Sequence, residues 1–285
     1  MEDTILAQWS IVQARAIAAL GTPDFGPRLT QAIRALVPFD NVMLFVYRGE
    51  ERPLAAFTDV ASSDEARIIM EGYITGPYLL DPYFTEVLNG RLTGLARLSD
   101  IAPDRFFETE YFKRHYIRTG IVDEIGFFMG LPDGVTAVLS LTKRGAVSRF
   151  TSDEIALLSD LGPAIRTLGA HNWMPLYKEF ESRRVGETRP GIDPVHPIEM
   201  AMNTVGQDVL SRRESEVVAF ILRGHSTESI ALHLGISPGT VKIHRKKAYS
   251  KLAISSQAEL FSLLLDRLRN IVEKLQSTTL EPGST

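Results

Sequence analysis

A cluster of basic residues in the carboxyl-terminal third of the chain has the residue types and spacing that point most directly to chemistry. Between Ser211 and Leu252 the sequence contains eight Lys or Arg and three Glu, although the whole chain has a formal net charge of -4. A positive surface confined to one region of an acidic protein favours a polyanion as the partner of that region. The residue types therefore predict binding to double-stranded DNA, with an ordinary solvated lysine surface as the alternative.

The positions of these basic residues on a predicted helix favour DNA. Ser237 and Pro238 predict the first residues of that helix. At about 100° per residue, Val241, Ala248 and Leu252 share its buried side. The opposite side carries Lys242, Ile243, Lys246, Lys247 and Ser250. An outward isoleucine among lysines suits a major groove, where proteins contact thymine methyl groups and base edges. The predicted DNA contacts are Thr240, Lys242, Ile243, Arg245, Lys246 and Lys247.

Two helices are predicted immediately before the basic one. Ser211 and Glu214 have the S-x-x-E spacing of a capping box, which predicts a helix that ends near Gly224. Ser226 then caps a short second helix, and Gly235 supplies the residue that ends it. Helices joined by glycine turns in this way are typical of a helix-turn-helix.

The whole pattern resembles the LuxR-type helix-turn-helix family. The stretches that carry the resemblance are Leu210-Ser-Arg-Arg-Glu214, Ser229-Ile-Ala231, Leu234-Gly-Ile-Ser237, Thr240-Val-Lys-Ile-His244 and Lys251-Leu252. The resemblance implies that Lys242, Ile243 and Lys246 face the DNA. It also implies a bacterial transcription regulator, with RNA polymerase as a possible further partner.

Aromatic residues in the first half of the chain collect around one acidic residue, Asp81, which precedes Pro82. Aromatic side chains with a few polar anchors line small-ligand pockets, but they also fill ordinary protein cores, so both interpretations stay open. The predicted ligand-binding residues are Tyr73, Asp81, Tyr83, Phe107, Tyr111 and Phe127.

The order of predicted elements in this half resembles a GAF or PAS-type sensor. The stretch Tyr-Leu-Leu-Asp81-Pro82 is similar to the Asp-Pro of LuxR-type autoinducer-binding domains. That similarity implies that Asp81 accepts a hydrogen bond from a ligand amide. Autoinducer sensors have a tryptophan before this aspartate, whereas the tryptophans of this chain are Trp9 and Trp173, so the identity of the ligand stays open.

Hydrophobic periodicity predicts a two-domain fold class: an α+β domain, then an all-α helix-turn-helix domain. The first domain is expected to be a GAF/PAS-like α/β/α sandwich with one antiparallel sheet, and a single helix is expected over residues 103–118. Pro and Gly residues without apolar periodicity predict a linker. The predicted boundaries are 1–180 for the sensor domain, 181–205 for the linker, 206–276 for the DNA-binding domain and 277–285 for a tail.

The last predicted helix carries apolar residues in steps of three and four, which is the spacing of a heptad seam. We expect this seam to form part of a homodimer interface, and a two-fold dimer would bind a palindromic operator. Packing within its own domain is the alternative. The predicted interface residues are Phe261, Leu264, Leu268, Ile271 and Leu275.

The remaining sequence signals argue against an enzyme. The chain has no cysteine, no metal-ligand motif and no nucleotide-binding fingerprint, so no cofactor or metal is expected. Gly235-Ile-Ser-Pro-Gly239 matches G-x-S-x-G, but Pro238 lacks the N–H that an oxyanion hole needs.

No apolar run approaches the roughly 18 residues that span a bilayer, so a cytoplasmic protein without membrane contact is expected. The alternatives are a regulator controlled by a protein partner without a ligand and, from another class, an enzyme or scaffold with an incidental basic helix.

Overall fold

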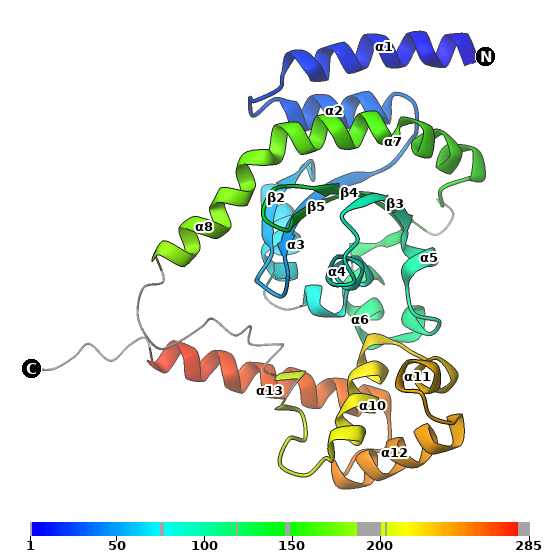
Figure 1. The fold of residues 1–285 in the computed structure, drawn as a ribbon, viewed down its shortest axis with the longest axis vertical. Helices are drawn as coiled ribbons and strands as arrows, with labels where there is room; N and C mark the ends of the chain where they lie inside the picture. The colour runs from blue at the N-terminus through cyan, green and yellow to red at the C-terminus, as the bar shows by residue number, and fades with distance from the viewer. Residues whose placement is uncertain are drawn as a thin grey trace, which may run out of the picture. The chain divides into compact units, whose positions relative to one another are not determined.

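Five strands pair into one antiparallel sheet in the order β2-β1-β5-β4-β3 (Figure 1). The computed structural model describes residues 2–74, 77–117, 119–145, 149–186, 201–202 and 204–278. The sheet lies in the first of two compact units, which comprises residues 1–74, 82–101 and 119–190. Its strands are β1 (Asn41–Arg48), β2 (Leu54–Thr58), β3 (Thr93–Arg97), β4 (Ile121–Gly130) and β5 (Val135–Arg144).

The strands β4 and β5 form the central hairpin of the sheet. Asp133 and Gly134 adopt positive φ angles of 59° and 71°, a backbone conformation that suits a tight hairpin turn. Leu131 N donates to Val135 O over 2.8 Å and closes the turn. Register then pairs Phe127 with Leu139 and places alternate residues of both strands on the same side of the sheet.

Helices cover both sides of this sheet (Figure 1). One side is packed against α1 (Glu2–Ala18), α2 (Phe25–Arg34) and α7 (Ser152–Trp173), whose buried residues form one hydrophobic core with the sheet. The other side faces α3 (Ser63–Ile74) and α4 (Pro82–Leu88), while α5 (Leu98–Ile101) follows β3 and α8 (Tyr177–Gly186) follows α7. The predicted α/β/α sandwich with an antiparallel sheet is therefore confirmed.

Four helices make up most of the second unit, which comprises residues 75–81, 102–118 and 191–285. They are α10 (Arg212–Arg223), α11 (Thr227–Leu234), α12 (Pro238–Lys251) and α13 (Gln257–Thr278). This all-α arrangement confirms the fold class predicted for the carboxyl-terminal region. In the part of the chain that the structure describes, no helix is both long enough and apolar enough to span a bilayer.

The single helix predicted over residues 103–118 is wrong. The segment forms the 3-10 turn η2 (Phe106–Glu108), the short helix α6 (Glu110–Phe112) and the π-helical turn η3 (Lys113–Ile117). Thr109 interrupts the helical path because its backbone is extended, with φ -67° and ψ 154°, and its side chain accepts a hydrogen bond from Phe112 N. This segment and the 3-10 turn η1 (Pro77–Leu80) belong to the second unit.

The units therefore differ from the predicted boundaries, which assigned residues 1–180 to one continuous sensor domain. Within the second unit, hydrogen bonds join Asp104 and Arg105 to the turn between α10 and α11, and the sequence pattern does not show these contacts. Residues 181–186 of the predicted linker continue α8, and residues 187–200 lie outside the described residues. Helix α13 continues to Thr278, and residues 279–285 of the predicted tail also lie outside the described residues.

Candidate DNA-binding and ligand-binding sites

Helices α10 and α11 begin and end at the residues that the sequence predicts, and α12 begins where it is predicted to begin. Ser211 and Glu214 form a capping box at the start of α10, and Gly224 ends that helix with a φ of 94°. Ser226 caps α11 by accepting a hydrogen bond from Ser229 N over 3.1 Å. Gly235 ends α11 with a φ of 64°. These local bonds satisfy the free N–H and C=O groups of the helix ends and fix the turns between the helices.

The serine of the G-x-S-x-G match, Ser237, caps the third helix. Ser237 precedes α12, and its hydroxyl oxygen accepts a hydrogen bond from Thr240 N over 3.1 Å. The same oxygen lies 2.8 Å from Thr240 Oγ1. Its neighbour Pro238 occupies the first turn of the helix, where the missing N–H costs nothing. Ser237 thus serves as a helix cap in this structure.

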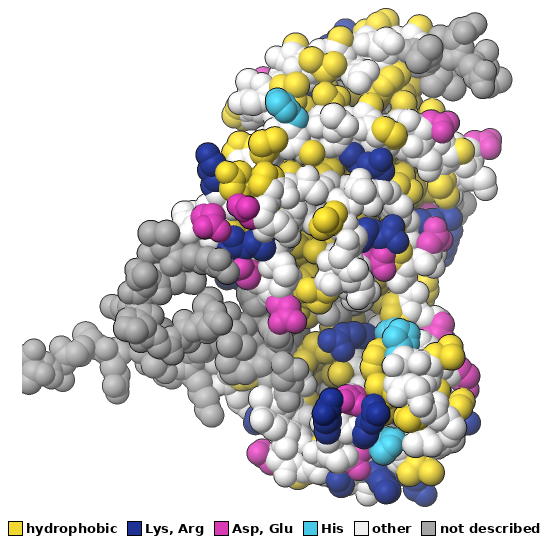
Figure 2. All heavy atoms as spheres, viewed as in Figure 1, with side chains coloured by type: hydrophobic (Ala, Val, Ile, Leu, Met, Phe, Trp, Pro, Cys, Tyr) yellow, Lys and Arg dark blue, Asp and Glu magenta, His cyan; other side chains and the backbone are white. Residues whose placement is uncertain are grey.

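Helix α12 presents the predicted basic side to solvent. Val241 and Ala248 are buried, whereas Ile243 is 55% exposed. Figure 2 shows Lys and Arg side chains gathered over α12. The predicted DNA contacts Lys242, Arg245, Lys246 and Lys247 are all exposed, and Thr240 is half-buried. An exposed isoleucine between exposed cations fits a surface that contacts DNA bases better than a lysine surface that faces only solvent.

A buried carboxylate ties the end of α12 to the start of α10. Glu214 is 3% exposed, and its Oε2 accepts hydrogen bonds from Lys251 Nζ and Ser211 N, each over 2.7 Å. The bond from Lys251, followed by those from Ser211, lowers the pKa of Glu214 from 4.5 to about 2. Because this pKa is depressed in the folded protein, the stabilisation is present above about pH 4.5 and is lost as the pH falls towards 2.

A cavity of about 740 Å³ lies beside α12. Lys242, Arg245 and Lys246 line it from α12, and Thr227 lines it from the first turn of α11. Gln257, at the start of α13, contributes to the wall and donates to Ile221 O over 3.0 Å. Three cations beside a helix N-terminus can accommodate the phosphates of a nucleic-acid backbone.

In the first unit, one side of the sheet carries a cluster of aromatic residues. Phe45 and Tyr73 have ring centroids 4.2 Å apart, and the hydroxyl groups of Tyr47 and Tyr73 are 2.8 Å apart. Tyr83 packs against Phe128 with a centroid distance of 5.9 Å. Of these residues, Tyr73 and Tyr83 are among the ligand-binding residues predicted from the sequence. The prediction missed Phe45, Tyr47 and Phe128, which only strand register could have placed on the same side.

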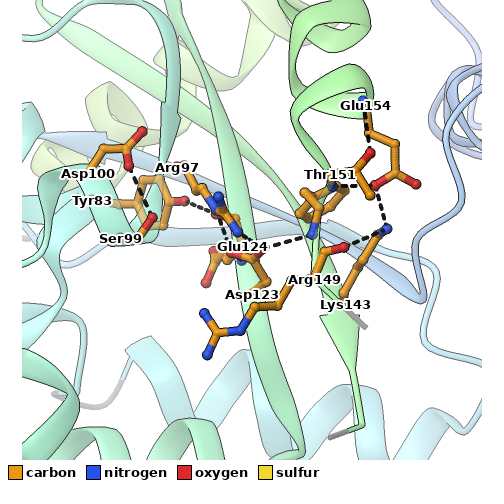
Figure 3. Close-up of polar contacts among 11 residues, drawn as sticks. Tyr83, Arg97, Ser99, Asp100, Asp123, Glu124, Lys143, Arg149, Thr151 and Glu154 are labelled. Atoms are coloured by element: carbon orange, nitrogen blue, oxygen red, sulfur yellow. Dashed lines mark hydrogen bonds and ion pairs between the residues drawn. The ribbon is translucent and has the colours of Figure 1, made fainter. Parts of the chain in front are cut away.

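Tyr83 is held by the backbone of two strands. Its hydroxyl donates to Glu124 O over 3.1 Å and lies 3.3 Å from Ala96 O. Gly126 is required beneath the ring because a Cβ there would lie 2.4 Å from Tyr83 Cε1. Figure 3 shows Tyr83 directed towards Glu124 of β4. It also shows the ion pair between Arg97 of β3 and Asp123, the residue before Glu124 on β4.

Charged contacts at the end of the hairpin fix β4 and β5 against the start of α7 (Figure 3). Asp123 accepts hydrogen bonds from Arg97 Nε over 3.0 Å and from Phe150 N over 2.9 Å. Lys143 pairs with Glu154 over 2.7 Å. Burial raises the pKa of Glu154, but the hydrogen bond and charge of Lys143 together with the hydrogen bonds from Thr151 outweigh it, so this pKa is lowered. These ion pairs are structural supports for the sheet that carries the aromatic cluster.

The structure does not bring together all six predicted ligand-binding residues. Phe127 lies on the side of the sheet opposite Tyr73 and Tyr83, in the core with α1, α2 and α7, because successive strand residues point to opposite sides. Asp81 and Tyr111 belong to the second unit, where Tyr111 Oη donates to the buried Asp81 carboxylate over 3.5 Å. Phe107, in the same unit, is 41% exposed.

The predicted dimer seam also requires a correction. Phe261 and Leu264 are buried at 6% and 0% exposure within the second unit, so they are core residues of their own subunit. The helix that carries them, α13, contacts α10. Ile271 is partly exposed, and the side chains of Leu268 and Leu275 lie outside the described residues.

Comparisons with known proteins agree with this geometry. The family model "Bacterial regulatory proteins, luxR family" matches residues 208–264. The "Putative HTH-type transcriptional regulator in exeN 3'region" of Aeromonas salmonicida is 35% identical over 191 residues, which cover 66% of this chain and 94% of that protein. The transcriptional regulatory protein UhpA of Escherichia coli is 38% identical over 60 residues, which cover 21% of this chain and 31% of UhpA.

The amino-terminal region is similar to a solved structure. The crystal structure of the VqsR LBD domain from Pseudomonas aeruginosa matches with a TM-score of 0.50 and 29% sequence identity. The match covers 57% of this chain and 95% of the VqsR domain. The predicted resemblance to LuxR-type regulators is confirmed. The chain belongs to the luxR family of bacterial regulatory proteins and is a helix-turn-helix transcriptional regulator.

Proposed function

We propose that this regulator acts as a homodimer on an inverted-repeat operator and that a small molecule bound to its amino-terminal region controls it. The exposed side of α12, with Ile243 between Lys242 and Lys246, is the observation that carries the DNA-binding part of the proposal. The protein works by binding rather than catalysis, and RNA polymerase is a further partner that such a regulator would contact.

The two-fold arrangement follows from the small size of one reading surface. A single helix-turn-helix makes few base contacts, whereas two modules related by a two-fold axis double them. The part of α13 from Leu268 to Leu275 extends beyond the buried Leu264, and we propose that it contributes to the contact between subunits. Leu268, Ile271 and Leu275 therefore remain the proposed interface residues.

Selection of bound duplexes from a random-sequence pool tests the operator. The enriched sequences should contain two inverted half-sites whose centres are about 10 base pairs apart, because two recognition helices reach successive major grooves on one side of the duplex. The variant Ile243→Ala, carried through the same selection, should relax preference at the base pairs that contact this side chain. Enrichment of a single half-site by the unaltered chain would contradict the two-fold arrangement.

The ligand part of the proposal rests on Asp81. Asp81 is buried, with 5% of the residue exposed, and its carboxylate accepts a hydrogen bond from Tyr111 Oη over 3.5 Å. The similarity to the VqsR LBD domain and the Asp-Pro sequence support a role for Asp81 as the acceptor for an amide N–H of a small molecule. A buried carboxyl group gains from such a donor, because an unpaired polar group is costly away from water.

A thermal-shift screen of the full chain against a library of N-acyl amides tests this role. A ligand present at about 100 times its dissociation constant should stabilise the chain by about 2.7 kcal/mol. Asp81→Ala should weaken binding of that ligand by roughly 10- to 100-fold, because the amide N–H of the ligand would be left buried without an acceptor. Tyr111→Phe, which removes one hydroxyl group, should have a smaller effect. Equal ligand affinity of Asp81→Ala and the unaltered chain would exclude Asp81 as the anchor.

A further inference from the structure

The turn between α10 and α11 is in close contact with residues Asp104–Thr109, which belong to the same unit. Arg105 N donates to Gly224 O over 3.0 Å, and Ser226 N donates to Asp104 Oδ1 over 2.8 Å. A Cβ at Gly224 would lie 2.7 Å from Thr109 Cγ2 and 2.9 Å from Phe106 Cα, so the turn packs against this segment without room for a side chain. Phe106 and Thr109 are buried at 0% and 1% exposure, as expected for a packed contact.

The group that reaches the start of α11 is an anion. Burial alone would raise the pKa of Asp104, but the hydrogen bonds from Ser226 outweigh it and the pKa lies below its ordinary value. Asp104 is therefore ionised at neutral pH. Its carboxylate oxygen stands at a helix N-terminus, where the backbone N–H groups and the helix dipole favour negative charge.

A helix-turn-helix uses the same helix end on DNA. Its first helix crosses the phosphate backbone while its second helix reads the major groove, and N–H groups at helix N-termini donate to phosphate oxygens. Here α11 is the first of these helices and α12 is the second. The Asp104 carboxylate thus has the charge and the hydrogen-bond acceptor of a backbone phosphate oxygen.

The cavity beside α12 gives an independent reason to expect competition. Its wall includes Thr227 of α11 and Lys242 and Lys246 of α12, which are the groups that a phosphate strand next to the reading helix would meet. Arg105 lines the same cavity and forms an ion pair with Glu108. Residues Asp104–Thr109 therefore occupy space beside the reading surface as well as the start of α11.

We propose that residues Asp104–Thr109 form an autoinhibitory strap, in which the Asp104 carboxylate takes the place of a DNA phosphate at the start of α11 and must leave before the duplex binds. This inference rests on the DNA-binding function of the helix-turn-helix. A ligand or partner that favours the released strap would strengthen DNA binding, because the apparent affinity is reduced by the fraction of chains in which the strap is docked.

Binding of a fluorescent duplex of about 30 base pairs and mixed sequence, followed by anisotropy in about 0.1 M salt, tests the strap in the full chain. Asp104→Ala removes the hydrogen bond to Ser226 and should tighten binding about 10-fold. Asp100→Ala is the matched control, because it removes the same charge from an exposed residue whose carboxylate is hydrogen-bonded to Ser99. The control should change affinity by less than about 2-fold.

Hydrogen exchange of the full chain provides a second measurement. The Arg105 amide, which donates to Gly224 O, should exchange slowly in the free protein and faster once the mixed-sequence duplex is bound. Equal tightening by Asp104→Ala and Asp100→Ala, or an Arg105 amide that stays protected on DNA, would overturn the strap. If the unaltered chain and both variants all fail to bind the duplex, the DNA-binding function itself is wrong, and the strap with it.

Discussion

Replacing both Lys242 and Lys246 with Glu should weaken DNA binding at least about 100-fold. Each lysine is exposed on the reading side of α12, and a side chain that contacts a base contributes about 1 to 3 kcal/mol to binding. The two glutamates would add repulsion from the phosphates. The slope of log K against log salt should also fall by about two, since two cations no longer displace counterions. Titration of the selected operator at several salt concentrations measures both quantities.

The control for this double variant must carry the same change of net charge. Arg28→Glu with Lys178→Glu meets that condition, because both side chains are exposed and both lie in the first unit. Its effect should be limited to the weak, salt-screened repulsion of distant charges. If the two double variants weaken binding equally while both remain folded, α12 does not read the DNA.

The second large effect is expected at Phe127. Phe127→Ala should destabilise the first unit by about 3 to 5 kcal/mol, because the side chain is fully buried between the centre of the sheet and α7. One of its ring atoms would lie 3.7 Å from a Cβ at Gly162, which shows how closely the helix packs there. For a unit of this size the melting temperature should fall by roughly 10 °C in a calorimetric scan.

Phe107→Ala is a suitable comparison, since it removes the same side chain from a position that is 41% exposed. Its cost should stay below about 1 kcal/mol. A Phe127→Ala protein that melts as the unaltered chain does would show that Phe127 is not a core residue. The predicted ligand-binding role of Phe127 would then have to be considered again.

Local sequence signals were enough to predict the helix-turn-helix and the exposed side of α12. Caps such as Ser211 with Glu214 and Ser237 with Thr240 act over three residues, so their pattern is visible in the sequence. The exposure of Lys242, Ile243 and Lys246 also follows from local geometry, because about 100° per residue separates them from the buried Val241 and Ala248.

The side of the sheet that each strand residue faces, in contrast, depends on contacts between strands and could not be predicted from the sequence. Residues 125–129 of β4 are buried on both sides of the sheet, so no alternation of polar and apolar residues indicates which side each one faces. The sequence could therefore select Phe127 for a ligand pocket when Phe128 is the residue that packs against Tyr83. Register with β5, a contact between separate strands, fixes the difference.

The same limit applies wherever a partner is distant in the sequence. The spacing of Phe261 and Leu264 is that of a heptad seam, yet both are buried within their own subunit, on a helix that contacts α10. The bonds from Ser226 to Asp104 and from Arg105 to Gly224 join residues more than a hundred positions apart. Periodicity and capping report only the nearest turns of the chain, so the burial of an apolar helix side and the docking of residues 104–109 had to come from the folded structure.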